Sequence, residues 1–250
     1  MTRIIKLCYW NGTVNAGVAF SGFILDSMGL PFKLSNHPNI VITGSILGDS
    51  RFKNAYIWGL GFGNATEAQP RNNVLACRGK LTQQLLNVDC VLGDPGILAS
   101  YFYTPSVNKK YKFGIIPHYV DFEWFSANRI AKIIDIRTSN FAQLFSEINE
   151  CEFIISSSLH GIIFALSYGI PAFHVQHTEL ASKKSFKFND FFSATSMPHR
   201  IANVETVDQL KAINYDYLYS HRADYVISST EIQQMQNNLL SVFPYKWKKR

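Results

Sequence analysis

The stretch that decides the fold runs from Phe153 to Ala172 and reads FIISSSLHGIIFALSYGIPA. It begins with an apolar run, which three serines separate from a longer apolar segment. It ends with a glycine and a proline, after which another apolar run begins. We therefore predict a strand, a serine-rich turn, a helix that ends at Gly169, and a second strand. Two strands that are joined through a helix are expected to be parallel.

The rest of the chain repeats this alternation of short apolar segments and helical segments. Continuous apolarity predicts strands that are buried on both faces, as in a parallel sheet covered by helices. The predicted strands are residues 4–9, 39–43, 55–58, 74–77, 88–92, 113–117, 131–136, 153–156 and 172–175. Residues 140–150 are predicted to form a helix with a buried face, and Ser228 with Glu231 forms a capping box before a last helix.

The polar, proline-containing segment from Thr104 to Lys110 is the best candidate for a connection between two parts. A series of strand–helix units lies on either side of it. We predict an α/β protein with two Rossmann-like halves that face a cleft, residues 1–110 and 111–250. Ligands of such sheets bind beyond the carboxyl ends of the strands, so the site is expected between the halves.

Composition narrows the class of protein. The chain has 250 residues, of which 47% are hydrophobic, and no apolar run approaches the roughly 20 residues of a membrane span. Lys6 interrupts the first apolar run, so no signal peptide is predicted. The four cysteines show no CxxC pair, which indicates reduced, buried thiols and a cytoplasmic location.

The net charge of +6 favours anionic partners. No nucleic-acid-binding motif is present, so nucleic acid is not expected. The aromatic and basic tail from Tyr245 to Arg250 suits peripheral contact with an anionic membrane, at the inner face of the plasma membrane. The alternative is an ordinary solvated terminus.

The serine-rich turn is the main candidate for a functional site. It places hydroxyls and free N–H groups at a helix N-terminus, which binds phosphate or carboxylate. His160 lies in the first helical turn, where it can act as a general acid. The alternative is that Ser156, Ser157 and Ser158 cap the helix and that His160 only packs.

Several motifs, in order, give a family resemblance. Ser-Leu-His-Gly at 158–161, followed by Gly-Ile-Pro at 169–171, resembles the signature of polysaccharide pyruvyl transferases. The other segments that resemble this family are residues 41–47, 58–63 (Trp-Gly-x-Gly), 77–82 (Arg-Gly-x-x-Thr), 93–96 (Gly-Asp-Pro), 114–119 (Ile-Pro-His) and 187–193 (Lys-Phe-x-Asp). Each motif is weak alone, but together they cover roughly residues 40 to 195 in the expected order.

The resemblance implies a fold similar to two-domain (GT-B-type) glycosyltransferases, with phosphoenolpyruvate (PEP) as donor substrate and no further cofactor. Pyruvate would move as a ketal onto a sugar of a surface polysaccharide or its lipid-linked precursor, with release of phosphate. The first half would be the acceptor side and the second half the PEP side. Two positions depart from the family: Ser158 stands where many members have arginine, and the segment from Asn15 to Val18 lacks an expected acidic residue.

The site residues follow from the resemblance and from their chemistry. His160 is the candidate acid, or a partner of the phosphate that assists its departure. His118 is the candidate base, with a structural histidine as the alternative. Arg78 is the leading ligand of the PEP anion, because a guanidinium binds carboxylate and phosphate bidentately; the alternative is a surface salt bridge. The remaining PEP candidates are Ser156, Ser157, Ser158, Leu159, Gly161 and Lys187.

The acceptor candidates are Asn15, Trp58, Tyr119 and Asp190, of which Asp190 is also placed to orient Lys187. A solvated Lys187–Asp190 pair is the alternative, and core packing is the alternative for the aromatic residues. No His, Asp or Glu cluster has metal-ligand spacing. Two other functions stay open: a glycosyltransferase that uses a nucleotide sugar, and a non-catalytic protein of the same fold that binds a sugar or an anion.

Overall fold

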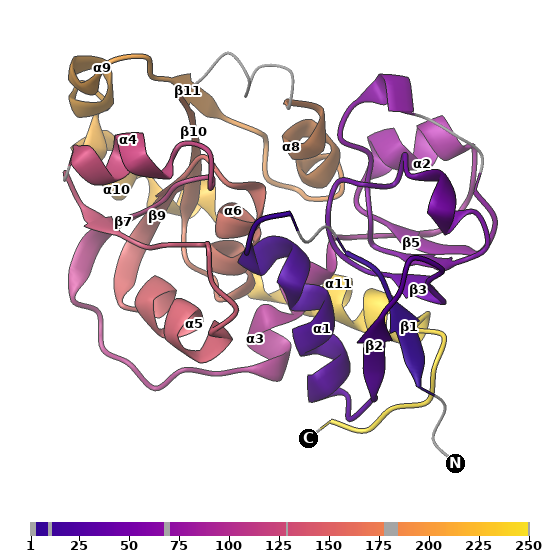
Figure 1. Ribbon diagram of the computed structural model, residues 1–250. Coiled ribbons are helices and arrows are strands. Elements are labelled where there is room, and N and C mark those ends of the chain that lie inside the picture. Colours follow the sequence, from indigo (N-terminus) through magenta and orange to yellow (C-terminus); the bar gives the residue numbers. More distant parts are fainter. Residues whose placement is uncertain (1–3, 10–11, 68–70, 129, 178–184, 250) are drawn as a thin grey trace.

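The computed structural model describes residues 4–9, 12–67, 71–128, 130–177 and 185–249 (Figure 1). They form two sheets, with strand order β2-β1-β3-β4-β5-β6 in the first and β11-β10-β9-β7-β8 in the second. Every strand pair is parallel. The prediction of an α/β protein with two Rossmann-like halves is confirmed.

The first sheet is built from short strands. Its elements are β1 (Ile5–Leu7), α1 (Ala16–Ser27), β2 (Phe32–Leu34), β3 (Ile40–Val41), η1 (Ser50–Phe52), β4 (Tyr56–Trp58), η2 (Ala65–Glu67), β5 (Val74–Cys77), α2 (Lys80–Leu86), β6 (Val91–Leu92), η3 (Pro95–Leu98) and α3 (Ala99–Phe102).

The second sheet has longer central strands. Its elements are β7 (Tyr111–Ile116), α4 (Phe122–Ala127), β8 (Lys132–Ile133), α5 (Phe141–Asn149), β9 (Cys151–Ser156), α6 (Leu159–Ser167), β10 (Ala172–Gln176), α8 (Ser185–Phe192), β11 (Ile201–Asn203), α9 (Val207–Lys211), α10 (Tyr215–Ser220), η4 (Arg222–Tyr225) and α11 (Ser229–Ser241).

All nine strands expected from the sequence are present, although several are shorter. The two that were missed, β2 and β11, each lie at one edge of their sheet; β6 and β8 lie at the other edges and were predicted. An outer strand has one neighbour and keeps exposed residues, as Leu34 and Ile201 are here. The strands β2 and β11 lack the continuous apolar run on which the prediction rested.

The helices α5 and α11 follow the apolar pattern and the capping residue from which they were predicted. In α5 the side chains of Phe141, Leu144, Phe145 and Ile148 are buried as the pattern predicted. Ser228 accepts a hydrogen bond from the Glu231 N–H at the start of α11. The Glu231 carboxylate, however, accepts from the Ser196 backbone N–H at 2.7 Å, so it ties α11 to the segment after α8.

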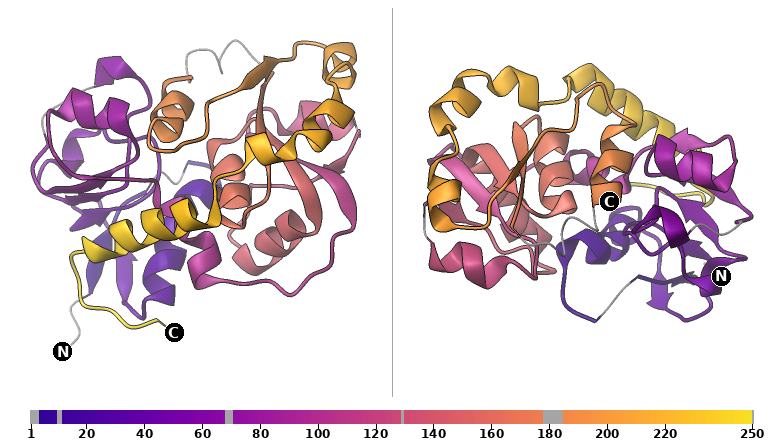
Figure 2. Two further views of the ribbon diagram at one scale, coloured as in Figure 1. Left: turned by 180° about the vertical axis from the view of Figure 1, so that it is seen from behind. Right: turned by 90° about the horizontal axis from the view of Figure 1, so that it is seen from above.

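The two halves share one core because two helices cross between them. The Phe20 ring of α1 packs edge-on against Phe145 and Phe164 of the second half. Figure 2 shows α11 crossing in the other direction, from the second half back to the first. There the Trp58 indole N–H donates to the Leu239 carbonyl at 2.9 Å. The chain passes from the first sheet to the second between β6 and β7. The division into residues 1–110 and 111–250 stays a prediction.

The described part of the C-terminal tail packs on the first half. The Lys248 N–H donates to the Met28 carbonyl at 3.3 Å, and the Trp247 ring contacts Tyr101 and Phe102. The Lys249 ammonium lies 4.6 Å from the centre of the Tyr101 ring. Membrane contact through this tail stays a prediction. None of the described helices is long and apolar enough to cross a bilayer.

The cysteines are free thiols. Cys8, Cys77 and Cys151 are buried, as predicted, whereas Cys90 is half-buried. The Cys90 and Cys77 sulfur atoms are 3.5 Å apart.

A histidine pair holds α8 against the second sheet. The His174 ring of β10 stacks on Phe188, with ring centres 3.7 Å apart. Its Nδ1 lies 2.9 Å from the His199 Nε2, and the His199 Nδ1 lies 2.6 Å from the Asn189 side-chain oxygen. Burial, followed by the charges of His199 and Lys187, lowers the pKa of His174 to about 2. His174 is therefore neutral in the folded protein.

This pair predicts a loss of stability in mild acid. Below pH ~6.5 the unfolded chain protonates His174 while the folded chain does not, so the free energy of unfolding falls as pH falls. We expect His174 to contribute a loss of about 2 kcal/mol between neutral pH and pH 5. Urea denaturation at several pH values measures it. His174→Gln should flatten the slope, and the exposed His37→Gln should not; equal slopes for His174→Gln and the wild type would contradict the assignment.

Candidate active site

The serine-rich turn between β9 and α6 is held by its own hydroxyls. The Ser156 hydroxyl contacts the Ile116 carbonyl at 2.6 Å and accepts from the Ser158 N–H at 3.0 Å. The Ser157 hydroxyl accepts from the His118 N–H at 2.8 Å, so it ties this turn to the loop after β7. Ser156 and Ser157 thus shape the loop, and all three serines are buried.

The N-terminus of α6 lacks the usual hydrogen bond to its N-cap side chain. The preceding residue, Ser158, has extended backbone, and its hydroxyl makes no capping hydrogen bond. The first-turn N–H groups of a helix have no partner within the helix, and they carry a partial positive charge. The end of α6 can therefore receive a phosphate or carboxylate.

His160 projects from this first turn towards the first half. Its side chain is 11% exposed, and its Nε2 lies 3.6 Å from the Asp94 Oδ1. Gly17, in the first turn of α1, packs on the imidazole so closely that a Cβ there would lie 2.2 Å from Nδ1. The histidine of one half thus sits against two residues of the other half.

The loop after β7 places His118 and Tyr119 beside the same turn. Both are half-buried, and their ring centres are 4.4 Å apart. The bond from the His118 N–H to Ser157 fixes the loop against the end of α6. From the first half, Asn15 caps α1 by accepting from the Gly17 N–H at 2.8 Å. Asn15 and His160 therefore belong to the region where the two halves meet, and His118 lies on the loop beside the end of α6.

Arg78 lies elsewhere than expected. It is fully buried, and its Nε donates to the Asp190 carboxylate at 2.9 Å. Its Nη1 donates to the Ser45 hydroxyl at 2.7 Å, and its Nη2 to the Phe62 carbonyl at 2.6 Å. With each nitrogen bonded inside the protein, the guanidinium does not face a ligand in this structure. The alternative predicted for Arg78, a salt bridge at the surface, is also wrong, because the pair with Asp190 is buried.

Asp190 is the partner of Arg78 and also caps α2. Its carboxylate accepts from the Thr82 N–H at 2.8 Å and from the Thr82 hydroxyl at 2.7 Å. Gly79 makes this approach possible, because a Cβ there would lie 1.6 Å from the Asp190 carbonyl oxygen. Asp190 is enclosed by these contacts, so the structure gives it no open face for an acceptor sugar.

Helix α8 therefore joins the halves, and Figure 1 shows it between α2 and the second sheet. The Lys80 N–H at the start of α2 donates to the Ser193 hydroxyl, just beyond α8, at 2.8 Å. Lys187 lies on the same helix, half-buried, with its ammonium 5.2 Å from the Phe188 ring centre. Arg78 and Lys187 are the two expected PEP ligands with a positive charge. Lys187 lies outside the hydrogen-bond network of Arg78.

Three other predicted site residues lie in the core. The Trp58 ring has no exposed surface and packs against Phe243, so it cannot stack on a sugar. Leu159 is 1% exposed. At Gly161 a Cβ would lie 2.4 Å from the Ser156 hydroxyl, so this glycine lets α6 pack on the end of β9.

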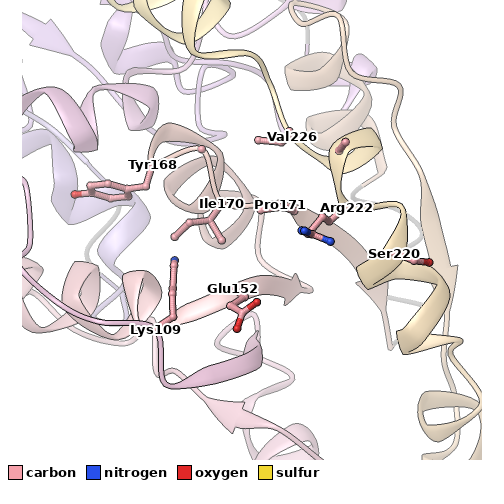
Figure 3. Close-up of a pocket in the computed structure, with 10 residues that line it drawn as sticks. Lys109, Glu152, Tyr168, Ile170, Pro171, Ser220, Arg222 and Val226 are labelled. Atoms are coloured by element: carbon pink, nitrogen blue, oxygen red, sulfur yellow. The ribbon is translucent and has the colours of Figure 1, made fainter.

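A separate pocket of about 680 Å³ lies at the opposite end of the second sheet (Figure 3). Glu152 and Pro171, near the amino ends of β9 and β10, line it together with Lys109 and Arg222. The Lys109 ammonium already donates to the Cys151 carbonyl at 2.6 Å, and Arg222 donates to the Tyr219 carbonyl at 3.0 Å. The residues of the candidate site gather at the carboxyl ends instead.

Within the described ranges, no group of three or more His, Cys, Asp or Glu side chains is arranged to hold a metal ion.

The fold and this site define an α/β protein with two parallel sheets, an uncapped helix N-terminus and a histidine where the halves meet. The chain belongs to the polysaccharide pyruvyl transferase family, whose sequence model matches residues 4–179. A relative is an uncharacterized protein of Acanthamoeba polyphaga mimivirus, which is 33% identical over 216 residues. The match covers 76% of this chain and 74% of that protein.

Sequence reasoning gave no role to Asp94 and Thr82, although both stand in motifs that it identified. Asp94 is the acidic residue of the Gly-Asp-Pro turn, and Thr82 ends the Arg-Gly-x-x-Thr motif. For Asp94 the available signal was a carboxylate among apolar residues, because such a group needs partners when buried. Thr82 stands near Lys80 and Gln83 and gave no such signal.

The Arg78–Asp190 pair predicts a large effect on stability. Asp190→Ala leaves a buried guanidinium without its counter-charge, so the free energy of unfolding should fall by about 3–5 kcal/mol. Replacing both residues by apolar ones, Arg78→Met with Asp190→Leu, should cost less than Asp190→Ala alone. Denaturant unfolding measures all three proteins.

The matched control is Asp216→Ala, which breaks the exposed Lys112–Asp216 pair. It should cost less than about 1 kcal/mol. A cost for Asp190→Ala as small as that of the control would mean that the buried pair does not hold the halves together.

Proposed function

We propose that this protein transfers pyruvate from PEP to a sugar as a ketal, with release of phosphate. The observation that carries the proposal is His160, set in the first turn of an uncapped helix where the two halves meet. Membership of the pyruvyl transferase family supports the reaction type. A polysaccharide, or its lipid-linked precursor, is the acceptor that the family name suggests.

The PEP anion would bind at the N-terminus of α6. The first-turn N–H groups of α6 and the Ser158 hydroxyl suit a carboxylate or phosphate oxygen. Lys187, half-buried on α8, would supply positive charge to the phosphate. Because the Arg78 guanidinium is fully engaged, its role would be to fix α8, and with it Lys187, rather than to bind PEP.

The reaction starts with a proton transfer to carbon. His160 donates a proton to the methylene carbon of PEP, which leaves an oxocarbenium-like centre at C2. A sugar hydroxyl attacks this centre, and its proton passes to His118. Phosphate then leaves with the C–O bond electrons, and a neighbouring hydroxyl closes the ketal and loses its own proton. General acid catalysis of this kind contributes typically 10²–10⁴-fold to a rate.

The acceptor would enter between Asn15 of the first half and Tyr119 of the second. Both are half-buried beside elements that contact the end of α6. An amide side chain and a phenol offer the directional hydrogen bonds and the flat apolar face that a sugar ring needs. Trp58 and Asp190 are enclosed and would not contact the acceptor.

Turnover tests the proposal. Purified protein is incubated with PEP and a panel of saccharide acceptors, and phosphate release is measured. We expect release that depends on the acceptor, and a loss of about 100-fold or more in His160→Ala. The control is His221→Ala, an exposed histidine at the end of α10, which should act as the wild type does. Full activity of a folded His160→Ala would show that the site is misassigned.

A further inference from the structure

The turn from Gly93 to Gly96 places a fully buried carboxylate against His160. Asp94 follows β6 and caps η3, where its Oδ1 accepts from the Gly96 N–H at 2.8 Å. The same Oδ1 lies 3.6 Å from the His160 Nε2. The side chain of Asp94 has no exposed surface.

Each of these two side chains has a buried polar atom without a hydrogen bond. The Asp94 Oδ2 and the His160 Nε2 each have no hydrogen-bond partner among the described residues. Leaving such groups unpaired is costly, and the few in native proteins call for an explanation. A catalytic hydrogen bond is often long before substrate binds and shortens in the complex. The pair fits that case, since Nε2 lies 3.6 Å from the Asp94 Oδ1 and a small approach would give this nitrogen an acceptor.

The pair also spans the two halves. Asp94 comes from the first half and His160 from the second, and η3 packs directly on α6. His160 is held from the other side by Gly17 of α1. The ring is therefore fixed in place, and the carboxylate is the charged group that lies against its Nε2.

We propose that Asp94 is the positioning residue for His160, which rests on the proposed function of His160 as the acid. The carboxylate keeps a proton on Nε2 and stabilises the imidazolium, as an acidic residue does for a catalytic histidine in other enzymes. The proton for PEP then leaves from Nδ1, and the neutral ring that remains has its proton on Nε2. The donor site in the second half is complete only with Asp94 of the first.

A purely structural role for Asp94 makes a different prediction. Capping η3 uses one oxygen, and asparagine caps a helix about as well as aspartate. Asp94→Asn therefore keeps the bond to the Gly96 N–H and removes the charge. If capping were the only role, this variant would behave as the wild type.

The tautomer of His160 tests the pair without donor or acceptor. The full chain is labelled with ¹⁵N-histidine, the His160 signals are assigned with His160→Gln, and spectra are recorded where the imidazole is neutral. We expect the wild-type proton on Nε2, and a loss of that preference in Asp94→Asn. A wild-type proton on Nδ1 would overturn the proposal, and so would an unchanged pattern in the variant. If the variant does not fold, a wild-type proton on Nδ1 still overturns the proposal.

Kinetics separates this inference from the proposed function. Where PEP turnover is found, Asp94→Asn should lower kcat by about 10-fold or more and leave KM for PEP nearly unchanged, because the carboxylate acts through His160. Wild-type kcat in that variant would overturn the positioning role while leaving pyruvyl transfer intact. If no acceptor supports turnover but the Nε2 tautomer depends on Asp94, the pair stands and the proposed function fails.

Discussion

The buried ion pair between Arg78 and Asp190 is the constraint on which the rest of the structure depends. Neither side chain has any exposed surface, and 112 residues separate them in the chain. Taking two charges out of water is costly unless every donor and acceptor is paired. Here the guanidinium is bonded through all three nitrogens, and Thr82 gives the carboxylate two further hydrogen bonds. The pair fixes α8 against α2, and the stacked rings of His174 and Phe188 fix the same helix to the second sheet.

A site assembled in this way depends on the fit of the two halves. His160 lies in the first turn of α6, which belongs to the second half. The groups that hold its ring, Gly17 and Asp94, belong to the first half. The crossing helices α1 and α11 bury apolar side chains in a core common to both halves. The chemistry proposed for the protein thus needs no large motion to bring its histidine and carboxylate together.

The elements of the fold could be predicted because their signals are local. The apolar runs predicted the inner strands and two of the outer ones, β6 and β8, and a serine-rich turn between a strand and an apolar segment predicted α6. What Arg78 and Trp58 touch could not be predicted, because their partners, Asp190 and Leu239, lie more than a hundred residues away. Arg78, Thr82, Asp94 and Asp190 all belong to the motifs. The motifs did not distinguish a residue that holds the site together from one that binds PEP.

The most direct test of the account is a calorimetric titration of the purified chain with PEP and, separately, with UDP. The account predicts heat of binding for PEP, which requires no acceptor, and none for UDP. Binding of UDP without binding of PEP would contradict it and would favour a glycosyltransferase that uses a nucleotide sugar.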